Sequence, residues 1–187
     1  MFKVIKTIIK AGESTKKYPF VPLEVSDDFR GKPEYNPEQC IACAACTRAC
    51  PANALIMETD AAQGTRRWQL SIARCIFCGR CEEVCPTKAI KLSKEFELAV
   101  CNKEDLYQEA NFSLTHCREC DTAFAPRKAV EYALDLLQQA GMSDEQLNVR
   151  RQQLETCPAC RRKQNMMDAA NVFHTKHLNK EVADERN

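Results

Sequence analysis

The sequence predicts an α+β fold built around a small, internally repeated domain, with an arm before it and a helical extension after it. Two observations support this prediction. A run of four cysteines and a proline occurs twice, at an offset of 35 residues from Cys40 to Cys75, and each run is followed by a short apolar segment typical of a strand. Residues 126–187 instead read as helical. We therefore divide the 187-residue chain into 1–35, 36–100 and 101–187.

The first of these segments begins with the pattern of a basic amphipathic helix. Its apolar side chains share one helical face and its lysines lie elsewhere, which is typical of a helix at a membrane interface and equally compatible with one packed on protein. The apolar residues are Phe2, Ile5, Ile8 and Ile9, with Val4 at their edge. Four prolines follow between residues 19 and 37, so we expect an extended arm lying over a partner.

Composition limits the function further. Lys and Arg number 27 and Asp and Glu number 26, and this balance weakens nucleic-acid binding as a function. No apolar run reaches the roughly 20 residues of a transmembrane helix, and the start, "MFKVIKTIIKAG", lacks the features of a signal peptide. We therefore expect a cytoplasmic protein, in which disulfides are rare. Thirteen cysteines in such a chain indicate bound metal.

The two cysteine runs, "CIACAACTRACP" and "CIFCGRCEEVCP", share the pattern C-x2-C-x2-C-x3-C-P of bacterial ferredoxins with two [4Fe-4S] clusters. Three cysteines spaced two apart can wrap around one cluster, whereas the fourth starts a new direction and reaches the other cluster. One run alone could also be a zinc site; two complete runs are far more specific. The predicted ligands are Cys40, Cys43, Cys46 and Cys85 for cluster 1, and Cys75, Cys78, Cys81 and Cys50 for cluster 2.

Residues around the runs complete this domain. The segment "ALIMETDAAQGTRRWQLSI" predicts a hairpin that turns at "AAQG", and "AIKLS" predicts a further strand. Small residues in the cysteine loops let backbone amides approach the sulfurs: Ala42, Ala44, Ala45 and Gly79. We expect Ile41, Ile76 and Phe77 to shield the clusters from solvent.

Four later cysteines form two C-x-x-C pairs: Cys117, Cys120, Cys157 and Cys160. This is the spacing of a tetrahedral four-cysteine metal site, and it fits one Zn²⁺ or one rubredoxin-like iron equally well. Closing the intervening loop of 36 residues costs about 3 kcal/mol, which the about 10–16 kcal/mol of a structural zinc site outweighs. Two disulfides or four idle thiols fit a cytoplasmic chain less well. Cys101 remains, and we interpret it as a structural thiol.

Between these pairs we expect two helices joined by a short turn. Pro126 suits the first helical position and Gly141 a C-terminal cap, while Ser143 and Gln146 fit a capping box for the second helix. The first helix carries an apolar stripe of Val130, Ala133, Leu134 and Leu137.

The stretch "KYPFVPLEVSDDFRGKPEYNPEQCIACAACTRACP" resembles the two-cluster subunits of respiratory complex I and of the related membrane-bound [NiFe] hydrogenases. That resemblance covers residues 1 to about 100. With "HCREC" and "ETCPAC" in the tail, the chain is similar over nearly its whole length to the family of formate hydrogenlyase subunit 6 and hydrogenase-4 component H.

The resemblance implies a relay rather than an enzyme. Electrons would pass from a ferredoxin-like, formate dehydrogenase-linked subunit to the small subunit of a [NiFe] hydrogenase, within a hetero-oligomer that also contains the large subunit and a membrane module. The chain would lie peripherally on the cytoplasmic face of the inner membrane. Consistent with a relay, the sequence contains no dinucleotide or nucleotide-phosphate motif, so we predict no catalytic residues.

Three alternatives remain open from the sequence. The chain could serve a complex I-type path from NADH to quinone, or it could be a freely diffusing ferredoxin, although such a carrier needs neither arm nor tail. It could also bind nucleic acid through basic residues near the last cysteines, namely Arg150, Arg151, Arg161, Arg162 and Lys163. We favour an acidic protein partner for these residues and no nucleic acid.

Overall fold

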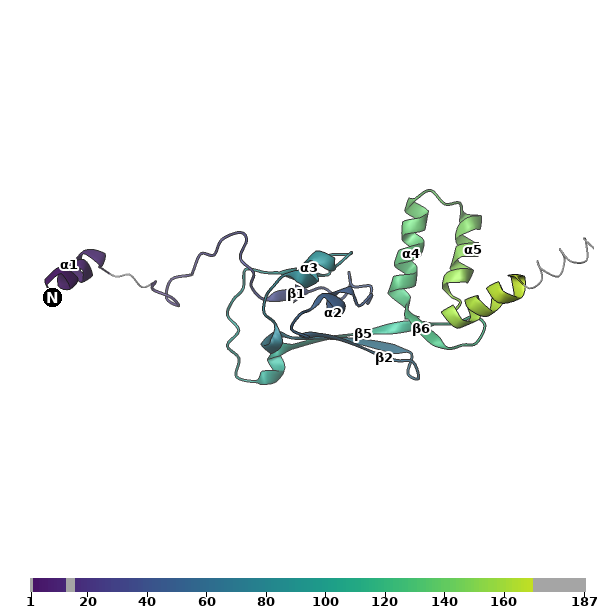
Figure 1. Cartoon of the computed structure of the whole chain (residues 1–187), viewed down its shortest axis with the longest axis horizontal. Coiled ribbons are helices and arrows are strands. Elements are labelled where there is room, and N and C mark those ends of the chain that lie inside the picture. The colour runs from purple at the N-terminus through teal and green to yellow at the C-terminus, as the bar shows by residue number, and fades with distance from the viewer. Residues whose placement is uncertain (1, 13–15, 170–187) are drawn as a thin grey trace, which may run out of the picture.

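The structure is a computed structural model that describes residues 2–12 and 16–169 (Figure 1). Its elements, in chain order, are α1 (Phe2–Ala11), β1 (Pro33–Tyr35), α2 (Ala45–Ala49), β2 (Leu55–Asp60), β3 (Thr65–Ser71), η1 (Ile72–Arg74), α3 (Arg80–Val84), β4 (Ile90–Leu92), η2 (Lys103–Leu106), β5 (Tyr107–His116), β6 (Ala123–Pro126), α4 (Arg127–Gln139) and α5 (Asp144–Leu154). A further helix runs over residues 158–169. Figure 1 shows α4 and α5 side by side beyond the end of the sheet.

The 35-residue repeat extends to the backbone conformation. The short helices α2 and α3 begin 35 residues apart, each after a residue in the left-handed region, Ala44 (φ 64°) and Gly79 (φ 80°). Within the loops, Ala42 and Phe77 also have positive φ, 53° and 54°. Left-handed backbone is uncommon for residues other than glycine, so its recurrence at equivalent positions shows that the two loops follow one path.

Two antiparallel sheets lie against these loops. The strands β1 and β4 form a two-stranded sheet, and the order β2-β3-β5-β6 forms a four-stranded sheet. The predicted hairpin is confirmed: β2 pairs with β3 from Leu55 opposite Leu70 to Asp60 opposite Thr65, and "AAQG" connects them.

The extension after residue 100 is not wholly helical, which corrects the expectation of a helical extension. Its strand β5 pairs with β3 along seven residues, from Thr65 opposite Ser113 to Ser71 opposite Tyr107. The arm likewise ends in β1, which pairs with β4. Both outer segments therefore contribute strands to the repeat domain.

The core forms where the sheets meet the cysteine loops. Its buried members include Leu55, Trp68, Leu70, Ile72, Ile90 and Phe112, which come from β2, β3, η1, β4 and β5. The ring of Tyr35 stacks on Trp68, with centroids 3.7 Å apart and planes 15° apart. Trp68 is 0% exposed, and full burial of a large apolar side chain stabilises the fold by roughly 1.5–3 kcal/mol.

The arm approaches the repeat domain closely just before β1. The Gly31 N–H donates to Ser93 O at 2.9 Å, and Lys32 N–H donates to Glu95 O at 2.6 Å. A Cβ at Gly31 would lie 2.2 Å from Glu95 O, so only glycine fits between these backbones. Ahead of the arm, no described residue of α1 is buried, and no helix among residues 2–12 and 16–169 is long and apolar enough to cross a membrane.

The end of α4 and the start of α5 have the predicted capping residues. Ser143 and Gln146 form a capping box at the start of α5, and Gly141 (φ 86°) follows the C-cap of α4. The prediction that Pro126 occupies the first helical position is wrong by one residue: it is the N-cap, since its ψ of 130° still belongs to β6. Val130 and Leu134 are the buried residues of α4.

Candidate metal centres

Two neighbouring cavities contain the eight cysteines of the tandem runs. The first cavity is lined by Cys40, Cys43, Cys46 and Cys85. The second cavity is lined by Cys75, Cys78, Cys81 and Cys50. Each cavity thus brings together three cysteines of one run and the fourth cysteine of the other, which are the sets predicted as ligands.

The fourth cysteine leaves its own cavity because of the backbone after each short helix. Cys50 (φ −75°, ψ 110°) and Cys85 (φ −75°, ψ 113°) are extended C-cap residues, and a proline follows each of them. Proline has no N–H and cannot continue the helical hydrogen bonds. The chain therefore turns away, and each of these side chains faces the other run.

Backbone N–H groups point at the sulfur atoms equally in both halves. Ala42 N–H donates to Cys40 Sγ and Phe77 N–H donates to Cys75 Sγ, each at 3.4 Å. Ala54 N–H donates to Cys50 Sγ at 3.3 Å, and Ala89 N–H donates to Cys85 Sγ at 3.2 Å. Such donors stabilise the thiolate form that binds metal.

Burial disfavours the charged thiolate form of the cysteines in the two cavities. It raises the pKa of Cys46 to about 11 and that of Cys81 to about 12. At Cys85 burial also raises the pKa, but the Thr87 hydroxyl and nearby backbone N–H groups outweigh it, so the pKa is lowered overall. Metal must displace protons from the buried thiols, and binding is therefore coupled to their deprotonation.

The lining of the first cavity also fits a sulfur-rich cofactor. The Tyr35 hydroxyl and Trp68 Nε1 are buried and have no hydrogen-bond partner among the described residues, although both residues line this cavity. Buried donors are rarely left unpaired, because each costs about 1–3 kcal/mol. Soft thiolates together with unpaired donors suit an iron–sulfur cluster, whose sulfur atoms accept hydrogen bonds.

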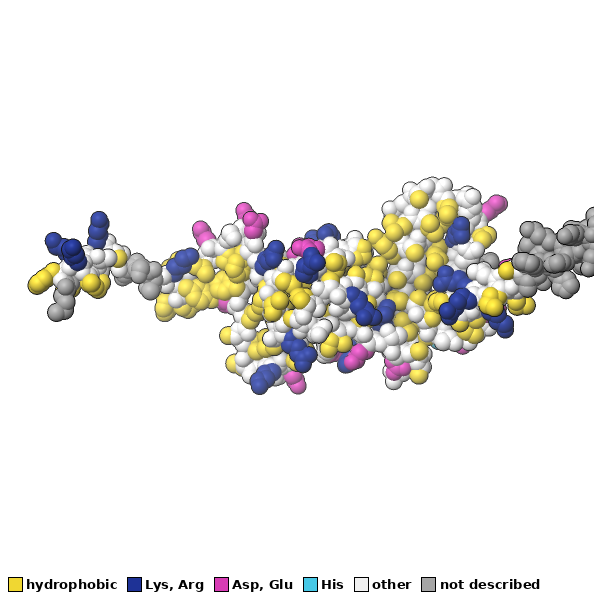
Figure 2. Space-filling view, viewed as in Figure 1, with side chains coloured by type: hydrophobic (Ala, Val, Ile, Leu, Met, Phe, Trp, Pro, Cys, Tyr) yellow, Lys and Arg dark blue, Asp and Glu magenta, His cyan; other side chains and the backbone are white. Residues whose placement is uncertain are grey.

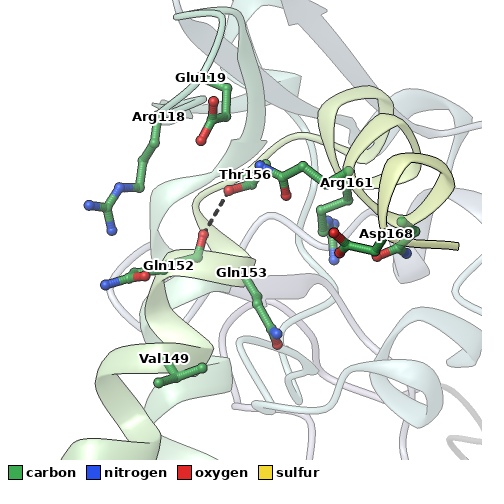
Figure 3. Close-up of a pocket in the computed structure, with 10 residues that line it drawn as sticks. Arg118, Glu119, Val149, Gln152, Gln153, Thr156, Arg161 and Asp168 are labelled. Carbon is green, nitrogen blue, oxygen red and sulfur yellow. Dashed lines mark hydrogen bonds between the residues drawn. The ribbon is translucent and has the colours of Figure 1, made fainter. Parts of the chain in front are cut away.

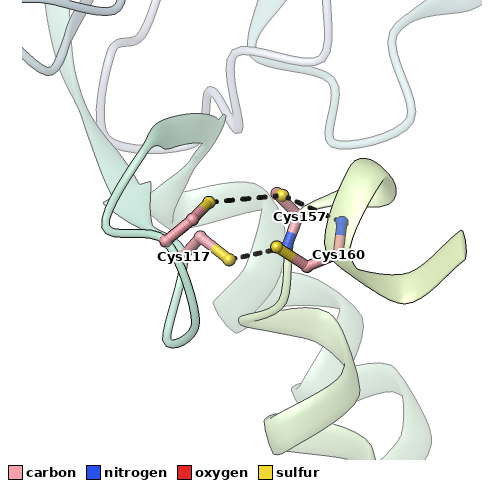
Figure 4. Close-up of side chains that lie close together, drawn as sticks. Cys117, Cys157 and Cys160 are labelled. Atoms are coloured by element: carbon pink, nitrogen blue, oxygen red, sulfur yellow. Dashed lines mark hydrogen bonds between the residues drawn. The ribbon is translucent and has the colours of Figure 1, made fainter. Parts of the chain in front are cut away.

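Cys117, Cys120, Cys157 and Cys160 meet at the base of the helical pair (Figure 4). Their Sγ atoms all lie within 4.8 Å of one another, and the Cys120 and Cys157 Sγ atoms are 3.7 Å apart. Tetrahedral ligands at the Zn–S distance lie about 3.8 Å apart. The four side chains are therefore placed to bind a single metal ion.

Hydrogen bonds also shift the pKa values of the thiols in this four-cysteine group. The backbone N–H of Cys157 donates to Cys117 Sγ at 3.2 Å and is the main reason that the pKa of Cys117 is lowered to about 6. Thr122 lowers the pKa of Cys120. Hydrogen bonding to Cys157 raises the pKa of Cys160 to about 12, which is expected when four thiols share one site and cannot all ionise without a cation.

A polar hollow (Figure 3) is lined in part by Glu119 and Thr156, which directly precede Cys120 and Cys157 in the sequence. Its walls include Arg118 and Arg161, and Arg118 pairs with Glu155 at 3.7 Å. The Thr156 hydroxyl donates to Gln152 O at 2.8 Å and so is already engaged. The lining contains no cysteine or histidine, and it offers no nucleophile with an adjacent base.

Sequence reasoning missed three residues that line the first cavity and misjudged Cys101, which lies outside both cavities. It did not single out Tyr35, Trp68 or Thr87. The 35-residue repeat aligns these residues with Leu70, Pro33 and Ala52, and this alignment could have revealed them. Cys101 was interpreted as a structural thiol, but it is exposed, whereas a structural thiol would be buried.

Comparison with known proteins identifies the family. Residues 39–89 match the 4Fe-4S dicluster domain. Formate hydrogenlyase subunit 6 of Escherichia coli strain K12 is 50% identical over 182 residues, which cover 97% of this chain and 100% of that protein. The chain belongs to the formate hydrogenlyase subunit 6 family. As a member of this family, it carries its iron–sulfur domain in the part of the chain where the tandem runs lie.

More distant relatives match about half of the chain. The chloroplastic NAD(P)H-quinone oxidoreductase subunit I of Angiopteris evecta is 40% identical over 97 residues, or 49% of this chain and 54% of that one. A chain of the archaeal membrane-bound sulfane sulfur reductase is 28% identical, with a TM-score of 0.44 and 56% of each chain covered.

Proposed function

We propose that this chain is a non-catalytic relay that carries electrons through two [4Fe-4S] clusters inside a membrane-associated complex. The observation that carries this proposal is the pair of adjacent cavities, each lined by four cysteines drawn from both runs. Cluster 1 is assigned to the first cavity, with ligands Cys40, Cys43, Cys46 and Cys85. Cluster 2 is assigned to the second, with ligands Cys75, Cys78, Cys81 and Cys50.

When bound, such clusters supply one-electron transfer, and the chain supplies their position and surroundings. Because each run provides ligands to both cavities, neither cluster can move without the other. The α2 and α3 helices pack against each other. Buried apolar residues such as Leu70 and Ile90 line the two cavities and exclude water from them.

The proposed direction and partners rest on the resemblance to the family. We propose a ferredoxin-like, formate dehydrogenase-linked subunit as donor and the small subunit of a [NiFe] hydrogenase as acceptor, in a hetero-oligomer with the large subunit and a membrane module. The relative's name, formate hydrogenlyase, supports this. The second candidate is a complex I-type role between NADH and quinone, which the similarity to NAD(P)H-quinone oxidoreductase subunit I favours. That similarity covers only 49% of this chain.

A peripheral position on the cytoplasmic face of the inner membrane is part of the same proposal. The apolar face of α1 is exposed, with Phe2 at 85% and Ile9 at 75%, and α1 carries lysines on its other side. A freely diffusing carrier gains nothing from such a helix, whereas a docked subunit can bury it against lipid headgroups or protein. Figure 2 shows further apolar side chains along the arm.

For the four-cysteine group we propose a structural metal ion outside the electron path. Zinc is the first choice, because closed four-thiolate sites are typical of structural zinc, and a rubredoxin-like iron is the second. The site has four protein ligands and therefore no open position for a substrate.

The test of the relay is anaerobic purification of the native complex, followed by metal analysis and reduction. We expect the subunit to co-purify with a [NiFe] hydrogenase, and the isolated, reconstituted full chain to contain about eight irons in two clusters, beyond any in the four-cysteine group. Formate should reduce both clusters in the complex, and H₂ should do the same from the other end. A monomer free of partners, or a complex in which NADH but not formate reduces the clusters, would contradict this assignment.

A further inference from the structure

The pseudo-twofold repeat allows the walls of the two cavities to be compared position by position. An offset of 35 residues relates each strand residue that lines the first cavity to one that lines the second: Tyr35 to Leu70, Met57 to Leu92, Pro33 to Trp68 and Leu55 to Ile90. Equivalent positions therefore face equivalent cavities, and any chemical difference between them distinguishes the two sites.

At three pairs of equivalent positions, two in strands and one in a loop, one cavity has an apolar residue where the other has a residue that can donate a hydrogen bond. All three donors lie in the first cavity. Tyr35 stands there where the second cavity has Leu70, Trp68 stands where it has Pro33, and Thr87 stands where it has Ala52. Leu70 and Pro33 are among the most deeply buried side chains, so water does not replace the missing donors.

The donors of the first cavity lie next to its cysteines. Trp68 Nε1 lies beside Cys46, and the Tyr35 hydroxyl lies beside Cys40. Neither atom has a hydrogen-bond partner among the described residues. An indole N–H can only donate, so its partner must be an acceptor within the cavity. The Thr87 hydroxyl is 3.7 Å from Cys85 Sγ.

Other groups near the cavities do not reverse this asymmetry. The backbone donors to sulfur are matched in the two halves. Each cysteine loop also receives one arginine: Arg66 donates to Ala42 O in the first loop and Arg30 donates to Cys78 O in the second, both at 2.9 Å. The side-chain donors are thus the main polar difference between the two sites.

We propose that Tyr35 and Trp68, with Thr87, donate hydrogen bonds to the sulfur atoms of cluster 1 and give it the higher reduction potential of the pair. Reduction adds one electron and one negative charge to a cluster, and donors aimed at its sulfur atoms stabilise that charge. When a low-potential one-electron donor supplies a single electron to the pair, the electron therefore resides on cluster 1. This inference rests on the proposed two-cluster function.

The test uses the full chain with both clusters reconstituted anaerobically and titrated potentiometrically with EPR detection. Trp68→Phe and Tyr35→Phe keep the stacked rings and remove one donor each, while Tyr107→Phe is the matched control on an exposed tyrosine. We expect each cavity variant to lower the higher midpoint potential and to leave the lower one in place. In the double variant, the ratio of the two singly reduced forms should change at least tenfold, which corresponds to about 59 mV.

Iron analysis distinguishes a failure of this inference from a failure of the proposed two-cluster function. If the wild-type chain does not hold two [4Fe-4S] clusters, both ideas fail. If it holds two clusters and the double variant leaves both midpoints unchanged, or moves only the lower one, the inference alone is overturned. Tyr35→Phe gives an independent result if Trp68→Phe does not fold.

Discussion

Cys85 follows α3 with an extended backbone, and this turns its side chain away from the loop that carries the other three cysteines of its run. Cys50 does the same after α2. One additional residue of spacing thus decides which cavity a thiol lines. Because the two cysteines exchange places between cavities, each cysteine run depends on the other for a complete set of four.

Loss of one exchanged thiol should damage the cavity that it lines and spare the cavity of its own run. In Cys85→Ser we expect the iron content to fall from about eight to about four, because cluster 1 loses a ligand. Alkylation followed by mass spectrometry should then label Cys40, Cys43 and Cys46, while Cys75, Cys78 and Cys81 stay protected.

Two further variants test this pattern. Cys50→Ser should give the opposite labelling, and Cys101→Ser, at an exposed cysteine outside both cavities, should retain all the iron. Labelling of Cys75, Cys78 and Cys81 in Cys85→Ser would show that each run binds its own cluster.

At the scale of single elements, α1 differs from the other described helices, because it combines a strong apolar face with the exposure of all its residues. Its described residues include Ile5 and Ile8 at 52% and 64% exposure. The short α2 and α3 are fixed by the cysteines, and α4 buries Val130 and Leu134. No residue in the described ranges 2–12 and 16–169 covers the apolar face of α1, and we expect an external surface to cover it.

Charged residues on that face should detach the subunit without affecting its clusters. We expect Ile5→Glu with Ile8→Glu to move the subunit from the membrane fraction to the soluble fraction, since burying two carboxylates in an apolar interface is costly. The iron content should remain at the wild-type level. Thr7→Glu, on the opposite side of the helix, is the control and should leave the subunit bound. Retention of the double variant at wild-type levels would rule out α1 as an anchor.

Across the whole molecule, β5 joins the extension to the iron–sulfur domain, while the four-cysteine group fixes its far end. The strand contributes Phe112 to the common core, and Lys128 of α4 donates to the backbone oxygens of Pro37 and Glu38 at 3.0 and 3.1 Å. By contrast, α5 has no buried residue. We infer that α4 is held by the sheet and that α5 is held by the metal ion proposed for the four-cysteine group.

Removal of the metal should therefore unfold the end of the chain and leave the centre intact. In Cys157→Ser we expect hydrogen exchange to accelerate across α5 and residues 158–169, because a structural metal site contributes about 10–16 kcal/mol in model peptides. The buried part of α4 should stay protected and both clusters should keep their iron. Elemental analysis of the wild-type protein distinguishes zinc from iron. Slower electron transfer in a Cys157→Ser complex that remains folded and assembled would place this site in the electron path instead.

The sequence by itself determined those features that depend on local spacing. The tandem runs, the hairpin with its turn, the capping box between Ser143 and Gln146 and the two late cysteine pairs can all be read from residues a few positions apart. The same runs predicted which cysteines share a cavity, because the extra residue before the fourth cysteine acts locally on the backbone.

Only the tertiary structure decided how the outer segments join the core. Phe112 and Leu114 alternate with polar residues in β5, but that pattern does not specify that the strand pairs with β3, since such pairing depends on contacts distant in sequence. The stack of Tyr35 on Trp68 likewise joins β1 to β3 across the fold. The burial and direction of a side chain depend on every element packed around it. The difference in hydrogen-bond donors between the two cavities is therefore seen only in the folded structure, where side chains from distant strands line each group of cysteines.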